Sequence, residues 1–115
     1  MTVEIVNLTP HSITIVGEDN SVLFELPGSQ HPARVTEHVT KDTPLYTADT
    51  TVPCFSVGYS SVVENLPDES PDSVYVVSQL VLQALPNRSD LYFPFPVVRD
   101  KNNQIIGCRG LGRLS

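Results

Sequence analysis

The residues best suited to bind a ligand lie near the C-terminal end of the chain. They are four arginines and two aromatic residues: Arg88, Tyr92, Phe93, Arg99, Arg109 and Arg113. The guanidinium fork matches the oxygen atoms of phosphates and carboxylates, and a nucleotide base can stack on an aromatic ring nearby. This grouping predicts a site for a small anionic ligand such as a nucleotide.

The same residues also have structural interpretations. Arg88 and Asp90 lie two apart after an expected helix, so they either form a local ion pair or Asp90 orients Arg88 toward a ligand. The aromatic residues of segment 91–96 stand between prolines, where they also suit edge packing or an oligomer contact. Arg109 and Arg113 share parity on the last expected strand and would point to one face if that strand stays regular.

Two further residues complete the candidate ligand-binding set, Ser78 and His11. Ser78 stands where a strand is expected to enter a helix, so its hydroxyl can cap the helix, the free N–H groups there can hold an anion, or the hydroxyl can be a nucleophile. His11 follows Pro10 at an expected kink, where it either hydrogen-bonds the turn or lines a pocket. Because every histidine is far from Ser78 in sequence, we favour the helix cap.

Common enzyme motifs are missing from the sequence. It has no serine-hydrolase elbow, no glycine-rich phosphate loop, and neither an HExxH nor a CxxC motif. We expect a non-enzymatic protein without cofactor or catalytic residue. A small hydrolase that uses Ser78 or a histidine stays open as a further hypothesis. The histidines and cysteines lack metal-ligand spacing, so no metal is expected. Cys54 and Cys108 are expected to be buried thiols, although they could form one disulfide.

The charge of the chain is divided unevenly along its length. The net charge is −6 over 115 residues, but residues 1–87 carry eleven acids and two bases, whereas residues 88–115 carry two acids and five bases. The first part is therefore at −9 and the second at +3. The acidic total disfavours binding to duplex nucleic acid, while the basic end leaves small anions open as ligands.

The sequence also argues against a membrane protein. No apolar run approaches the length of a membrane span, and the N-terminal residues MTVEIVNLTP carry an acid where a signal peptide has basic and then apolar residues. We therefore expect no membrane association and a cytoplasmic location.

Short strands dominate the elements expected from the sequence. Period-two alternation predicts strands near residues 3–5, 13–15 and 22–26, and a β-prone stretch at 33–36. Segment 41–53 is expected to be a loop or an exposed hairpin arm. A strand follows at 55–63, with Gly58 as a bulge or a point of close approach.

The most informative segment is the apolar strand 74–77, which leads directly into a helix over 78–85 that Pro86 ends. Strands 97–99 and 104–108 are expected to form a hairpin around residues 100–103. We predict one compact domain over 1–115 of the α+β class, with mainly antiparallel sheet and one short helix.

Several blocks of the sequence resemble a family of small, mostly uncharacterised proteins of bacteriophages and prophages. These blocks are NLTPH at 7–11, PARV at 32–35, YVVS at 75–78, ALPNR at 84–88 with DL at 90–91, VRD at 98–100 and IIGC at 105–108. The resemblance implies a phage protein acting in the host cytoplasm. By analogy of class it is also similar to phage anti-defence proteins that sequester nucleotide immune signals of the Thoeris and CBASS systems.

Two function hypotheses follow from these observations. In the first, a homo-oligomer sequesters a small anionic ligand, a cyclic nucleotide or a cyclic ADP-ribose type signal, to counter host defence. In the alternative, the protein is an interaction module that inhibits a host protein or serves as an accessory protein of the virion.

Overall fold

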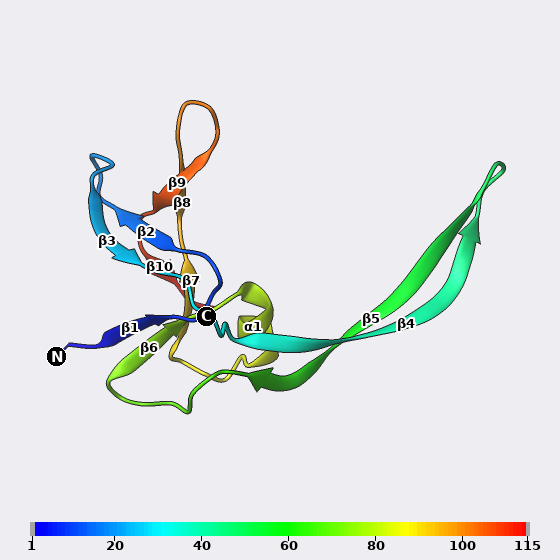
Figure 1. Ribbon diagram of the computed structural model, residues 1–115, viewed down its shortest axis with the longest axis horizontal. Helices are drawn as coiled ribbons and strands as arrows, with labels where there is room; N and C mark the ends of the chain where they lie inside the picture. The colour runs from blue at the N-terminus through cyan, green and yellow to red at the C-terminus, as the bar shows by residue number, and fades with distance from the viewer. Residues whose placement is uncertain (1, 115) are drawn as a thin grey trace.

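The computed structural model describes residues 2–114, which form a body of two β-sheets and a long hairpin arm that projects from it (Figure 1). The first sheet has the order β1-β6-β7-β10 and the second the order β3-β2-β9-β8, while β4 and β5 form a two-stranded sheet of their own. The strands are β1 (Glu4–Asn7), β2 (Ile13–Val16), β3 (Val22–Leu26), β4 (Arg34–Tyr46), β5 (Thr51–Glu64), β6 (Ser73–Val76), β7 (Leu91–Pro94), β8 (Val97–Arg99), β9 (Ile105–Cys108) and β10 (Leu111–Gly112). This confirms the predicted class, β-rich α+β with one short helix.

Helix α1 (Gln79–Ala84) connects two parallel neighbours of the first sheet, β6 and β7. Ser78 precedes it with extended backbone, and its hydroxyl accepts a hydrogen bond from the Val81 N–H at 3.4 Å. The predicted helix and its serine cap are therefore confirmed. The unit β6-α1-β7 is a parallel crossover. Its paired residues are far apart in sequence, so local sequence patterns do not predict the pairing.

The segment 74–77, which contains β6 apart from Ser73, is apolar, and both of its faces are covered. Tyr75 and Val77 face a core cluster beneath α1, which also contains Leu8, Ala33, Val81, Leu82 and Leu91. Val76, fully buried, faces a second cluster between the two sheets, made with Ile13, Leu26 and Cys108. The body thus has two apolar layers, with β6 between them.

Two of the chain's crossings between the sheets lie side by side. The chain leaves β7 for β8 at Phe95 and Pro96, and it returns from β9 to β10 at Arg109 and Gly110. Backbone hydrogen bonds tie the two crossings together, from Phe95 N–H to the Gly110 carbonyl at 3.0 Å and from Arg109 N–H to the Pro96 carbonyl at 2.9 Å. The expected hairpin between β8 and β9 is present.

The antiparallel pairs are β2 with β3, β4 with β5, β7 with β10, and β8 with β9. Three further pairs are parallel: β1 with β6, β6 with β7, and β2 with β9. The sheets of the body are therefore mixed, which the sequence did not predict.

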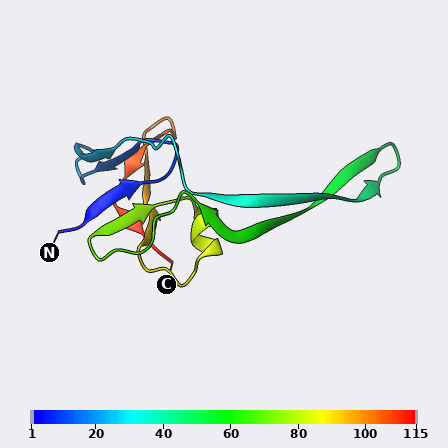
Figure 2. The same ribbon diagram turned by 60° about the horizontal axis from the view of Figure 1, so that its bottom comes forward.

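The arm is longer than expected, since it includes the β-prone residues on both sides of the predicted hairpin segment (Figure 2). Gly58 was expected to be a bulge or a close approach, and this is wrong. It pairs regularly with His38, and a Cβ placed there would meet no atom within 4 Å. The register shifts lie on either side of this pair, between Val35 and Glu37 nearer the body and between Asp42 and Leu45 nearer the tip.

The arm makes the molecule long. Its principal extents are 59 × 40 × 28 Å and its radius of gyration is 18.1 Å, against about 13 Å for a compact chain of this length. Among the residues described, no helix is long and apolar enough to cross a membrane.

Candidate ligand-binding cleft

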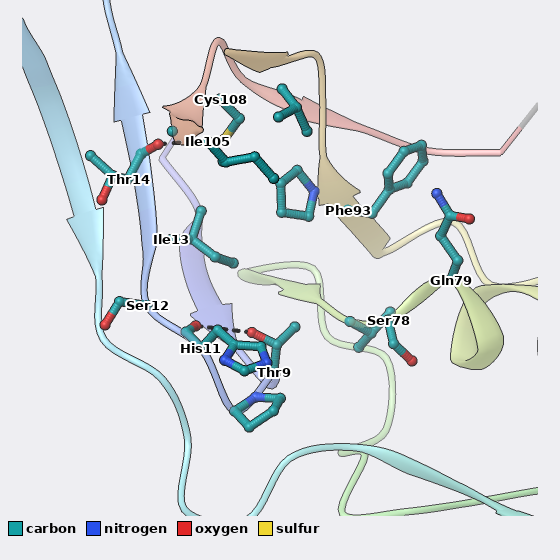
Figure 3. A pocket seen from close by; sticks show the side chains of 15 residues that line it. Thr9, His11, Ser12, Ile13, Thr14, Ser78, Gln79, Phe93, Ile105 and Cys108 are labelled. Carbon is teal, nitrogen blue, oxygen red and sulfur yellow. Dashed lines mark hydrogen bonds between the residues drawn. The ribbon is translucent and has the colours of Figure 1, made fainter. Parts of the chain in front are cut away.

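A cleft of about 580 Å³ opens between the two sheets, beside the start of α1 (Figure 3). Segments distant in the sequence supply its walls: the loop between β1 and β2 with the start of β2, the junction 77–79 between β6 and α1, and parts of β7, β8 and β9. The lining residues are Thr9, Pro10, His11, Ser12, Ile13, Thr14, Val77, Ser78, Gln79, Phe93, Pro94, Val97, Ile105, Gly107 and Cys108. Most of these side chains are apolar, and the polar ones lie mainly at the end formed by the loop and α1.

The loop that carries His11 is held by a buried amide, the side chain of Asn7. Its Nδ2 donates to the carbonyls of His11 at 2.8 Å and Pro27 at 3.1 Å. Its Oδ1 accepts from the backbone N–H and the hydroxyl of Thr9, at 3.0 and 2.7 Å. Asn7 thus fixes the kink, and His11 lines the cleft, one of its two predicted placements.

Ser78 and His11, remote in sequence, line the same cleft. The Ser78 hydroxyl bonds to Val81 N–H, and within residues 2–114 it makes no hydrogen bond to a histidine. The activated nucleophile that a serine hydrolase needs is a serine bonded to a base. The described contacts of Ser78 are those of a helix cap.

The apolar wall comes from β7, β8 and β9. Phe93 stands on β7, and Val97 and Ile105 at the rim are about half or more exposed although they are apolar. Gly107 allows β9 to pass close to β2, because a Cβ there would lie 2.6 Å from the Thr14 carbonyl oxygen. These aliphatic and aromatic surfaces, open to solvent, suit the body of a flat or apolar ligand.

Arg88 is engaged within the chain rather than in the cleft. Its guanidinium donates to both carboxylate oxygens of Asp90, at 2.9 and 2.7 Å, and Glu69 lies 3.8 Å away. These hydrogen bonds from Arg88 to Asp90 raise the pKa of the guanidinium above its usual value. Of the two arrangements considered for Arg88 and Asp90, the structure has the ion pair.

The other three predicted arginines lie at separate places. Arg99 donates to the Asn103 carbonyl at 2.9 Å in the β8-β9 turn, and Arg109 donates to the Gly17 carbonyl. Arg113 lies over the Tyr92 ring, 6.0 Å from its centre, and its guanidinium is 3.4 Å from the Ser89 carbonyl. None of these arginines lines the cleft.

The expectation that Arg109 and Arg113 share one strand face is wrong. β9 ends at Cys108 and β10 contains only Leu111 and Gly112, so both arginines lie outside regular strand. The chain bends at Arg109 and Gly110 as it passes between sheets, and this bend breaks the alternation on which the expectation relied.

Three members of the predicted ligand-binding set therefore meet in the cleft: His11, Ser78 and Phe93. The remaining members, Arg88, Tyr92, Arg99, Arg109 and Arg113, lie elsewhere. Sequence reasoning missed Gln79, Val97 and Ile105 as cleft residues. Gln79 and Ile105 carry no distinguishing sequence signal, because only the packing of two sheets brings them together.

The two cysteines are both free thiols. Cys108 is buried at the floor of the cleft, as expected, and burial raises the pKa of its thiol. Cys54 lies on the arm and is only partly covered, which differs from the expectation of a buried side chain. Within residues 2–114 no group of three or more His, Cys, Asp or Glu side chains is arranged to hold a metal ion.

Comparisons with protein-family models, with curated proteins and with solved structures gave no match to this chain.

Proposed function

We propose that this chain is a non-enzymatic binding protein that holds a small ligand in the cleft between its two sheets. The observation that carries the proposal is the convergence of sequence-distant residues on one open cleft of about 580 Å³. This volume lies within the range of small-molecule sites, which are typically mostly apolar with a few polar groups.

The chemistry of the lining indicates the kind of ligand. Phe93 and Ile105 offer surface for a flat ring, while His11, Ser12 and Gln79 offer hydrogen-bonding groups at one end. Among the lining residues described, His11 is the one whose side chain can become a cation, so the cleft itself provides little attraction for several phosphates. A nucleobase or another heterocycle fits this lining better than a polyphosphate does.

The resemblance to phage proteins supplies a setting for such a ligand. In an infected cell, a host signalling nucleotide of the cyclic ADP-ribose or cyclic oligonucleotide type would place its base in the cleft. Its phosphates would then remain toward solvent and His11. This revises the expected site: the base is held by the cleft, and the arginine cluster is not required.

Thermal unfolding with a panel of adenosine, AMP, cyclic ADP-ribose and a cyclic dinucleotide tests the proposal. A compound present at 100 times its dissociation constant stabilises the fold by about 2.7 kcal/mol. In a domain of this size that raises Tm by roughly 10 °C. Recovery of the compound unchanged after incubation separates binding from hydrolysis.

A matched pair of variants locates the site. Ile105→Ser removes an exposed apolar side chain from the cleft, whereas Ile106→Ser removes the neighbouring isoleucine, which does not line it. Losing the contact of one aliphatic side chain weakens binding by about tenfold. We expect this loss for Ile105→Ser alone. Equal effects of the two variants, or a panel without any stabilising compound, would contradict the proposal.

A further inference from the structure

The arm has one polar and one apolar face. Cross-strand partners share a face, and the pairs His38 with Gly58, Thr40 with Ser56, and Asp42 with Cys54 form the polar one. The alternate pairs are Glu37 with Tyr59, Val39 with Val57, and Lys41 with Phe55. We call the surface formed by these last six residues the arm's apolar face.

This apolar face is uncovered. The side chains of Val39, Phe55, Val57 and Tyr59 are each 50–58% exposed. The whole chain has an accessible surface of 8251 Å², about 2,000 Å² more than expected for a folded monomer of this mass. An isolated two-stranded hairpin is only marginally stable in water, so the arm needs a partner surface.

The apolar face continues the core outward. Val35 and Val63, paired at the base of the arm, pack against the core cluster beneath α1. Val35, Glu37 and Val39 alternate along β4 and lie on one side of it. The arm therefore extends a surface that is covered by the body at its base and left open farther out.

The order of residues on this face is complementary to itself. Val39 and Val57 form the middle pair, with Glu37 and Tyr59 on the side toward the body and Lys41 and Phe55 on the side toward the tip. When two such faces are stacked antiparallel about a two-fold axis through the middle pair, Glu37 of one copy meets Lys41 of the other. Tyr59 then meets Phe55, so opposite charges and aromatic rings coincide.

The antiparallel stacking also determines where the tip of each arm lies on the other copy. Val39 is near the middle of β4, so antiparallel stacking brings each tip to the base of the other arm. Tyr46 at the tip is 75% exposed. Beside the arm's base lies a hollow of about 320 Å³ between Tyr59 and the exposed face of α1, including Leu80.

We propose that two copies of the chain associate through the apolar faces of their arms, stacked antiparallel, with Glu37 of each copy against Lys41 of the other. The tip residue Tyr46 of each arm then lies near the base of the other copy's arm. The accessible surface of each copy exceeds that expected for a folded monomer of this mass by about 2,000 Å². Obligate dimers bury surface areas of this size. This association does not depend on the ligand proposed for the cleft.

Light scattering after size-exclusion chromatography tests this dimer on the full chain at micromolar concentration. The unmodified protein is expected at twice its 12.6 kDa mass. Glu37→Lys and Lys41→Glu each place like charges opposite one another at two positions of the dimer, so each weakens association at least tenfold. Mixing the two variants in equal amounts restores complementary charges, and a mixed dimer should form.

Thr40→Lys is the matched control, because Thr40 is exposed on the polar face. It should leave the dimer intact, and circular dichroism should show that all variants fold. A monomeric unmodified protein, a dimer indifferent to both charge reversals, or a mixture of the variants that stays monomeric would overturn the proposal. The proposal would also be overturned if the unmodified protein stays monomeric and its arm binds a different protein.

Discussion

Replacing Arg88 with methionine distinguishes a structural arginine from a ligand-binding one. Arg88 holds Asp90 through two charge-assisted hydrogen bonds, and the side chains of the pair are 17% and 9% exposed. Asp90 also anchors the sheet, since its carbonyl accepts from the Tyr75 N–H at 2.9 Å. The methionine variant keeps much of the side-chain volume but leaves the Asp90 carboxylate buried without its partner.

The size of the effect follows from this geometry. Breaking a buried ion pair by removing one partner costs about 3–5 kcal/mol, and two hydrogen bonds to charged groups account for a similar amount. Glu69 is exposed and 3.8 Å from Arg88, so its contribution is small. We expect Arg88→Met to lower the free energy of unfolding by about 3 kcal/mol, and Tm by roughly 12 °C.

Urea unfolding followed by circular dichroism measures this change, with Arg99→Met as the control. Arg99 donates to a turn carbonyl in an exposed setting, so its loss should cost less than about 0.5 kcal/mol. The double variant Arg88→Met/Asp90→Asn should recover part of the loss, because no unpaired charge then remains buried. If Arg88→Met unfolds like the unmodified protein, the ion pair is not stabilising and Arg88 is again a candidate for binding a ligand.

Three further changes test the packing around the cleft. Asn7→Ala removes the amide that holds the loop before β2 and should cost about 2–4 kcal/mol in urea unfolding, because buried partners lose their hydrogen bonds. Gly107→Ala should lower Tm by several degrees, since its Cβ would lie 2.6 Å from a β2 carbonyl oxygen, whereas Gly58→Ala meets open space and should leave Tm unchanged or higher. A thiol reagent at neutral pH should modify Cys54 quickly and Cys108 only on unfolding, because burial raises the pKa of the Cys108 thiol and less of the reactive thiolate forms. Equal rates for the two thiols, or equal Tm values for the two glycine variants, would contradict the described packing.

Local features of the fold could be predicted from the sequence. Ser78 before an apolar helical pattern predicted α1 and its cap, and Asp100 followed by Asn102 and Asn103 predicted the β8-β9 turn, where the Asp100 carboxylate accepts from the Asn102 N–H at 2.8 Å. These features depend on interactions between residues a few positions apart. The parallel pairing of β1, β6 and β7 depends on contacts between distant segments, and no local pattern predicts it.

The candidate site was predicted only in part for the same reason. Arg88, Arg99 and Arg109 are close in sequence, but a change of sheet and two turns separate them in the structure. His11 and Ser78 are distant in sequence, yet both line the cleft. The count of charges along the chain therefore suggested an arginine cluster that the fold does not bring together. The cleft is formed by the packing of the two sheets.

The most direct test of the cleft as a binding site is a methyl NMR titration of isoleucine-labelled protein. The probe is whichever compound of the nucleotide panel stabilises the protein most. Ile13 and Ile105 line the cleft, while Ile5, Ile15 and Ile106 do not, and these five are all the isoleucines of the chain. We predict saturable shifts for the methyl signals of Ile13 and Ile105, with the other three nearly unchanged. Shifts confined to the other three, or no shift in any of the five, would contradict binding in the cleft.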